Sequence, residues 1–267
     1  MKKNRLLIST CITITFITIF NLSCSNGGGI NIFSIEDDKA LGEQLDAEIL
    51  ADPTMYPILS ESTYDDAYDL MNDIRDRILA SGKITYADEF VWKLRIIHDD
   101  EILNAFCTPG GYIYVYTGLI KYLENEAQLA GVLGHEMAHA DLRHVTDQLT
   151  EQYGISLLVS IVLGENSSVL TDIAIGLAGL AFSRGDESQA DEYSVIYLCP
   201  TEYYAAGAAG FFEKIEAEGG TNIPEFLSTH PNPENRIEDI YATYDELMCG
   251  EGELFESRYD DLIDALP

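Results

Sequence analysis

The motif His135-Glu136-Met137-Ala138-His139 constrains this chain more than any other feature. Residues four apart in a helix lie one turn above each other on one face, so both imidazoles can reach one metal ion. Glu136 is offset enough to act as a base toward water without ligating the metal. The alternative is a pair of buried histidines hydrogen bonded within the core. A carboxylate beside two correctly spaced histidines favours a zinc site with Glu136 as the catalytic base.

A zinc hydrolase needs a third protein ligand and an open position for water. The pattern H-E-x-x-H-x-x-G-x-x-H fails here, because Val145 occupies the ligand position and His144 is one place out of register. We therefore expect His144 at the surface or beside the ligands. Glu187 offers a carboxylate instead, and Asp191, four residues on, is placed to accept a ring N–H from a histidine ligand. The alternative for Glu187 is a solvated side chain in an acid-rich protein.

Residues 1–23 have the layout of a bacterial secretory signal. Three basic residues precede an apolar stretch from Leu6 to Phe20, and small residues follow it. A permanent transmembrane helix is the alternative, but the stretch is shorter than the ~20 apolar residues that a span needs. We therefore expect a signal peptide over residues 1–23.

Cys24 stands where a lipoprotein signal peptidase exposes a cysteine for acylation. The following residues are small and rich in glycine, so residues 24–34 are expected to form a flexible tether. Plain secretion remains the alternative, because Asn21 occupies a position that is usually aliphatic in lipoprotein signals. We predict a lipid-anchored protein of the periplasm or cell envelope, with one core domain at residues 35–267.

The charge of the chain limits its partners. Lysine and arginine number 15 against 46 acidic residues, which gives a formal net charge of −31. Such a surface repels phosphate backbones and anionic lipids, so we expect no nucleic-acid partner. Membrane association must then come from the anchor or from an apolar element. The simplest interpretation of the charge is a well-solvated surface, and an acidic binding function is the alternative.

Five cysteines occur in the chain. Cys11 lies in the signal and Cys24 at the expected anchor, which leaves Cys107, Cys199 and Cys249. Cys199 and Cys249 each end a helical pattern and are candidates for a disulfide in an oxidising periplasm. Connectivity does not follow from sequence alone, so free thiols remain the alternative.

Hydrophobic periodicity predicts a mostly helical α+β fold with one small antiparallel sheet. The expected strands cover residues 90–97, 104–108 and 112–116. The expected helices cover residues 37–50, 64–78, 125–139, 153–163, 169–182, 186–199, 202–217 and 234–248. The two histidines of the metal motif fall on the helix that starts at Asn125, a plausible N-cap.

With these motifs the chain resembles the zinc metallopeptidase family of the heat-shock protease HtpX and the CAAX prenyl endopeptidase, within the thermolysin-like gluzincins. The matching segments are Asp37–Gly42, Asn104–Leu119, His135–His139, Glu187–Asp191 and Ser228–Arg236. The resemblance extends from about residue 35 to residue 250 and is nearest to the small periplasmic lipoprotein branch typified by LoiP. It implies a gluzincin fold, one zinc ion per chain, and cleavage of unfolded or misfolded envelope proteins.

The resemblance also implies roles for five further residues. The strand Asn104-Ala105-Phe106 would bind the substrate backbone by β-augmentation, with the Asn104 side chain near the scissile bond. The alternative for Asn104 is a turn-forming residue. His230 is implied to approach the metal or the oxyanion as a catalytic group. Arg236 is implied to support the ligands, and a purely structural ion pair is its alternative.

A rival function belongs to a different class of protein. The same fold could serve a proteolytically silent lipoprotein that acts as a chaperone or assembly factor. Glu136 favours the enzyme, because a binding module has no use for a base beside two metal ligands. The sequence leaves substrate preference and oligomeric state open.

The apolar stretch Tyr153–Phe182 has two interpretations. Each half is too short to span a bilayer, and residues 164–168 interrupt it. Core helices or a lid over the cleft are the default interpretation. The alternative is a patch that faces a membrane or another subunit near the active site.

Overall fold

The structure is a computed structural model that describes residues 32–219, 225–231 and 235–267. The expected signal peptide at residues 1–23 and most of the expected tether at 24–34 lie outside these residues. The described part is mostly helical with one three-stranded sheet, which confirms the predicted α+β class.

The elements follow one another along the chain from α1 to α12. They are α1 (Ile35–Ala51), α2 (Asp65–Leu79), β1 (Lys93–Ile97), β2 (Ala105–Thr108), β3 (Tyr112–Tyr116), α3 (Thr117–Tyr122), α4 (Glu126–Asp141), α5 (His144–Tyr153), α6 (Ile155–Val162), α7 (Ser167–Gly176), the 3-10 turn η1 (Leu177–Gly179), α8 (Arg184–Leu198), α9 (Gly207–Ala217), α10 (Glu225–Thr229), α11 (Arg236–Glu246) and α12 (Glu256–Ala265).

The sheet has the order β1-β3-β2 and is mixed. β2 and β3 form the expected antiparallel hairpin, whose turn uses Gly110 and Gly111 at positive φ. β1 instead pairs with β3 in parallel, from Lys93 with Tyr112 to Ile97 with Tyr116. The expectation of a wholly antiparallel sheet was therefore wrong for β1. A tight turn fixes the direction of a hairpin, whereas β1 reaches β3 through a longer connection that leaves its direction free.

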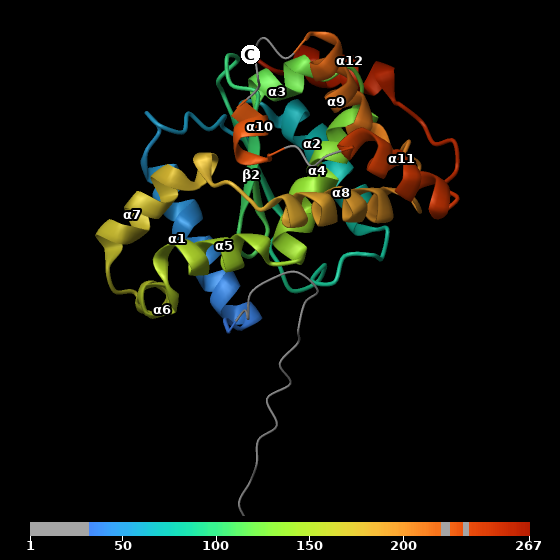
Figure 1. Cartoon of the computed structure of the whole chain (residues 1–267). Helices are drawn as coiled ribbons and strands as arrows, with labels where there is room; N and C mark the ends of the chain where they lie inside the picture. The colour runs from blue at the N-terminus through green and yellow to red at the C-terminus, as the bar shows by residue number, and fades with distance from the viewer. Residues whose placement is uncertain (1–31, 220–224, 232–234) are drawn as a thin grey trace, which may run out of the picture.

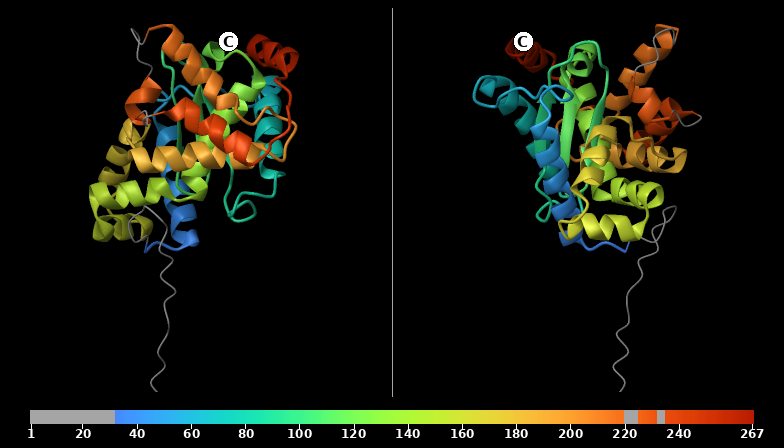
Figure 2. Two further views of the ribbon diagram at one scale, coloured as in Figure 1. Left: turned by 45° about the vertical axis from the view of Figure 1, so that its right-hand side comes forward. Right: turned by 90° about the vertical axis from the view of Figure 1, so that its left-hand side faces the viewer.

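Helix α4 lies at the centre of the molecule, and Figure 2 shows the sheet between α1 on one face and the α4 and α8 helices on the other. α4 packs against α8, α9 and β2, and all of its residues are buried. Two glycines allow this close approach. A Cβ at Gly131 would lie 2.4 Å from the backbone nitrogen of Ala208, and one at Gly134 would lie 2.9 Å from Oγ of Ser194. The helix that carries the metal motif is therefore held on several sides.

Helix α8 crosses α4 and packs against α11 (Figure 1). A capping box fixes its start, since Ser183 Oγ accepts from the amide of Asp186 and the Asp186 carboxylate accepts from the amide of Ser183. At its other end, a disulfide joins Cys199 to Cys249, just beyond α11. The pairing that the sequence left open is thus formed. Cys107 is the free cysteine among the described residues, and it is buried.

Several element boundaries differ from the predictions. The sequence analysis did not predict α3, α5, α10 or α12, and it started α9 five residues too early. Residues 90–92 precede β1 rather than belonging to it, and Trp92 has a positive φ. The apolar stretch forms α6, α7 and η1. No single helix in the described part of the chain has both the length and the apolar composition of a membrane span. The two segments Ile155–Val162 and Ser167–Gly179 meet these criteria only together, with a bend of 109° between them.

Candidate metal centre

Helix α4 directs His135 and His139 to the same side, one turn apart. Their Nε2 atoms lie 3.0 Å from each other. Glu187, in the first turn of α8, faces both rings: Oε2 is 3.4 Å from Nε2 of His135, and Oε1 is 3.3 Å from Nε2 of His139. The structure thus brings the three predicted ligands to one point.

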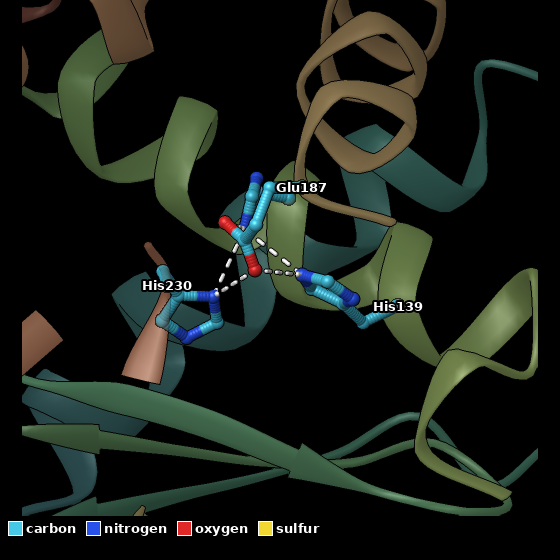
Figure 3. A group of neighbouring side chains, drawn as sticks. His139, Glu187 and His230 are labelled. Carbon is cyan, nitrogen blue, oxygen red and sulfur yellow. Dashed lines mark hydrogen bonds and ion pairs between the residues drawn. The ribbon is translucent and has the colours of Figure 1, made fainter. Parts of the chain in front are cut away.

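His230 joins this group from the segment that follows α10. Its Nδ1 lies 3.0 Å from Oε1 of Glu187 and 3.2 Å from Nε2 of His135. Figure 3 shows the side chains of His139, Glu187 and His230 pointing toward one another above the sheet. One ligand atom from each of His135, His139, Glu187 and His230 lies within 4.8 Å of the other three. Three nitrogens and one carboxylate oxygen form a donor set that suits zinc.

The charges of the cluster also fit a bound cation. Burial lowers the pKa of His139 well below its ordinary value, so its ring is neutral and able to ligate. Burial also acts to lower the pKa of His135, but hydrogen bonds to Asp191 and Glu187 outweigh it and raise that pKa to about 9. Burial acts to raise the pKa of Glu187, yet the surrounding histidines hold it well below its usual range. The carboxylates therefore demand a positive charge here, which a proton on His135 or a metal ion can supply.

Glu136 is fully buried beside this cluster, and neither of its carboxylate oxygens has a hydrogen-bond partner in the described structure. Its Oε1 lies 3.4 Å from Nε2 of His230. Burial raises the pKa of Glu136 above its ordinary value. His230 and the thiol of Cys107 are neighbours of this carboxylate that favour its charged form. A buried carboxylate with so few polar neighbours fits a further partner that arrives with the metal or the substrate. Together with the donor set, this supports zinc as the cofactor.

Asp191 and Arg236, which the sequence analysis singled out, both lie beside His135 and Glu187. Oδ1 of Asp191 lies 2.9 Å from Nδ1 of His135. Nη2 of Arg236 donates to Oδ1 of Asp191 at 2.7 Å and to Oε2 of Glu187 at 3.2 Å. The guanidinium is buried and lies 4.0 Å above the ring of Phe212. Arg236, at the start of α11, therefore links Glu187 and Asp191 of α8.

His144 contacts His139 at Nδ1, whereas Nε2 of His139 faces Glu187. Its Nδ1 lies 3.0 Å from Nδ1 of His139, and its Nε2 lies 3.0 Å from Oε1 of Gln189. The ring is buried. Of the two places expected for His144, the structure shows the one beside the ligands.

Two phenylalanines that the sequence analysis missed form walls of the site. Phe182 stacks on His139 at a centroid distance of 3.9 Å, and Phe226 stacks on His230 at 4.2 Å. Neither belongs to a spaced motif. The one available signal was the position of Phe182, directly before the capping box of α8. These rings help to close the cluster, whose members are at most 2% exposed.

Asn104, Ala105 and Phe106 lie at the start of the edge strand β2, and all three are buried. Nδ2 of Asn104 donates to the carbonyl of Ala178 at 2.9 Å, and its Oδ1 accepts from the amide of Ala105 at 3.0 Å. The side chain thus connects β2 to η1. Phe106 stacks on Tyr114 at a centroid distance of 4.6 Å.

Fold and site together define a gluzincin-type metallopeptidase, and comparison with known proteins agrees. The chain matches Peptidase family M48 over residues 70–243, more than half of its length. It therefore belongs to peptidase family M48.

Three relatives illustrate the similarity. The mitochondrial metalloendopeptidase OMA1 of Arabidopsis thaliana is 29% identical over 184 residues, which cover 64% of this chain and 37% of the relative. The beta-barrel assembly-enhancing protease of Yersinia pestis is 26% identical over 223 residues, which cover 77% of this chain and 43% of the relative. The protein of that name from Escherichia coli K12 is 31% identical over 161 residues, which cover 54% of this chain and 32% of the relative. The chain thus spans less than half the length of each of these three relatives.

Proposed function

We propose that this chain is a zinc-dependent endopeptidase that cleaves unfolded or misfolded proteins of the cell envelope. One observation carries the proposal: the carboxylate of Glu136 is buried beside the convergent side chains of His135, His139 and Glu187. Structural metal sites have no need of such a group, whereas hydrolytic sites require a base next to an open coordination position.

In the proposed mechanism, His135, His139 and Glu187 hold the zinc ion. An ion held there would supply Lewis acidity, which would polarise the scissile carbonyl and make water more acidic. Asp191 accepts the Nδ1 proton of His135, which fixes the tautomer that leaves Nε2 free to ligate. Arg236 holds Asp191 and Glu187 in place from α11.

Glu136 takes the proton from the attacking water and later delivers it to the leaving amine. No covalent intermediate is required. His230 is proposed to assist near the metal or the oxyanion, since its Nδ1 lies among the ligand atoms and its Nε2 faces Glu136. Because the cluster is almost closed to solvent, the segment of α10 and His230 or that of η1 and Phe182 must move before a peptide enters.

The proposed substrate is an extended backbone that adds to the edge strand β2. Ala105 and Phe106 would supply the main-chain groups that pair with it. Asn104 would contact the peptide near the scissile bond after exchanging its present bond to Ala178. A site that reads backbone groups suits unfolded proteins, whose main chain is accessible.

The relatives support an envelope location, because two of them are called beta-barrel assembly-enhancing proteases. We propose that the signal at residues 1–23 exports the chain to the periplasm and that Cys24 is acylated. Mass spectrometry of the mature N-terminus tests this part. An unmodified N-terminus would leave a secreted protein instead.

The proposal is tested on purified protein with Glu136→Gln, which keeps the size of the side chain and removes its basicity. Zinc content and thermal unfolding should match the wild type. Cleavage of unfolded casein should fall by about 10² to 10⁴, the usual contribution of general-base catalysis. If the wild type holds zinc, cleaves no unfolded protein and suppresses aggregation as well as the variant does, the chaperone interpretation replaces the peptidase.

A further inference from the structure

The segment between α5 and α8 differs sharply in composition from the rest of the chain. Residues 154–183 contain two charged side chains, Glu165 and Asp172, although 23% of the whole chain is charged. None of these residues is basic. We call α6 and α7, with the turn between them, the apolar arm.

The exposed side of α6 is mainly hydrophobic, whereas the turn and the exposed side of α7 are mainly polar and include Glu165 and Asp172. Ile155, Val159 and Leu163 follow one another at intervals of four, so they form one stripe along α6. Their exposed fractions are 41%, 40% and 73%, and Ile175 on α7 is 43% exposed. Of the eleven exposed large hydrophobic side chains among the described residues, four belong to this arm. A cluster of this kind on a strongly acidic protein indicates an interaction surface.

The inner face of the arm is part of the protein core. Leu158 and Ile161 of α6 are fully buried, and Leu170 and Ile173 of α7 are nearly so. Both helices pack against α1, and the hydroxyl of Tyr56 donates to the backbone of α7. The bend of 109° between the segments keeps them on the surface of the molecule. A partner therefore meets the arm from outside, without the helices leaving the core.

We propose that the apolar arm binds the surface of a lipid bilayer, with Ile155, Val159 and Leu163 inserted among the lipids. The arm offers no basic residue to anionic headgroups, so its affinity comes from apolar burial, and zwitterionic lipid suffices. This inference places the proposed enzyme against a membrane, but it does not depend on the cleavage reaction.

The position of the chain's N-terminal end supports a membrane over other partners. Figures 1 and 2 place α6 and the first turn of α1 at the same end of the molecule. Residues 24–34 lead from Cys24 to α1, and eleven residues reach no further than roughly 40 Å even when fully extended. An anchor at Cys24 would thus hold a bilayer close to the arm. A second copy of the chain carries the same negative charge and has no such reason to approach.

The arm is directly connected to the metal centre. α7 continues through η1, where the carbonyl of Ala178 accepts from Asn104, to Phe182, which stacks on His139. A bilayer bound along α6 would thus be linked to the start of β2 through α7 and η1.

The test is flotation with neutral phosphatidylcholine vesicles, using mature chain that carries Cys24→Ser so that acylation contributes nothing. This parent protein should float with the vesicles, equally at low and high salt. Val159→Asp and Leu163→Asp should each reduce partitioning by about tenfold or more, because each replaces an inserted apolar side chain by a charge. Met248→Asp is the matched control, since Met248 is 87% exposed and lies outside the arm. It should float like the parent.

Zinc content and thermal unfolding verify that each variant is folded. Glu136→Gln in the same background should float like the parent, because it changes the proposed cleavage reaction and not the apolar arm. Flotation therefore tests membrane binding separately from cleavage. Absence of flotation by the folded parent overturns the inference, as does equal flotation of parent and arm variants. If lipid-free parent sediments as a dimer, Leu163→Asp as a monomer, and neither binds vesicles, the arm joins two copies of the chain instead.

Discussion

Oδ1 of Asp191 lies 2.9 Å from Nδ1 of His135, although the two residues are 56 positions apart in the chain. This contact turns the opposite edge of the imidazole, with Nε2, toward Glu187. Glu187 and Asp191 sit one turn apart on α8, so a single helix supplies both a candidate ligand and the group that orients another ligand. The packing of α8 against α4 therefore determines the geometry of the site.

Removing Glu187 should abolish zinc binding. Glu187→Ala leaves two histidines of α4 and His230 near the metal position and eliminates the carboxylate that faces all of them. Zinc retained after dialysis, measured by elemental mass spectrometry, should fall from one ion per chain to near zero, and cleavage should disappear with it. Glu192→Ala, on the exposed side of the same helix, should retain both. Stoichiometric zinc in Glu187→Ala would remove this residue from the ligand set.

Changing Asp191 should lower the affinity for zinc without abolishing zinc binding. Asp191→Asn keeps the size of the side chain but loses the charge that stabilises a neutral His135 with its proton on Nδ1. Zinc affinity, measured by competition with a chelator, should fall by about 10- to 100-fold. An unchanged affinity would mean that Arg236, and not His135, is the functional partner of this carboxylate.

The disulfide should contribute substantially to stability. It links Cys199 to Cys249 across 50 residues, and cross-links of this kind typically add about 2–4 kcal/mol to the free energy of unfolding. Urea unfolding of the Cys199→Ser, Cys249→Ser double variant should show a loss in that range. A reductant should destabilise the wild type and leave the double variant unchanged. Equal unfolding midpoints for both proteins would contradict the prediction.

Asp100 should make stability depend on acid pH. Hydrogen bonds from Lys121 and Thr117 hold the pKa of Asp100 below its ordinary value. A folded-state pKa below the unfolded one adds stability above about pH 4, and this contribution is lost as the pH falls further. Asp100→Asn should therefore lower the unfolding free energy at pH 7 and have less effect at pH 3. The exposed Glu101 gives a control, since Glu101→Gln should change little at either pH.

The sequence predicted the parts of the site that obey a local period. The two histidines of α4 and the pair on α8 were recognisable because residues four apart share a helical face. His230 and Arg236 follow no such period and were placed by family resemblance alone. Phe182 and Phe226 were missed, because an aromatic side chain carries no sign of the ring on which it will stack.

The fold shows the same division between local and distant information. Helical periodicity located most helices, and the strand pattern located both strands of the β2–β3 hairpin. The parallel pairing of β1 with β3 depends on contacts between distant segments, so alternation within β1 contained no information about it. α12 was not predicted because only Tyr259 and Leu262 of this helix are buried, and two apolar positions are too few to define a helical period.

The disulfide between Cys199 and Cys249 also bears on the order in which the site is assembled. It ties the helix that carries Glu187 to the helix that carries Arg236, and it forms only where thiols are oxidised. A newly made chain in reducing surroundings would lack this covalent link, so α8 and α11 would be held together there by noncovalent packing alone. If the chain is exported as proposed, the disulfide would form only after export, and the two helices would be joined covalently only then.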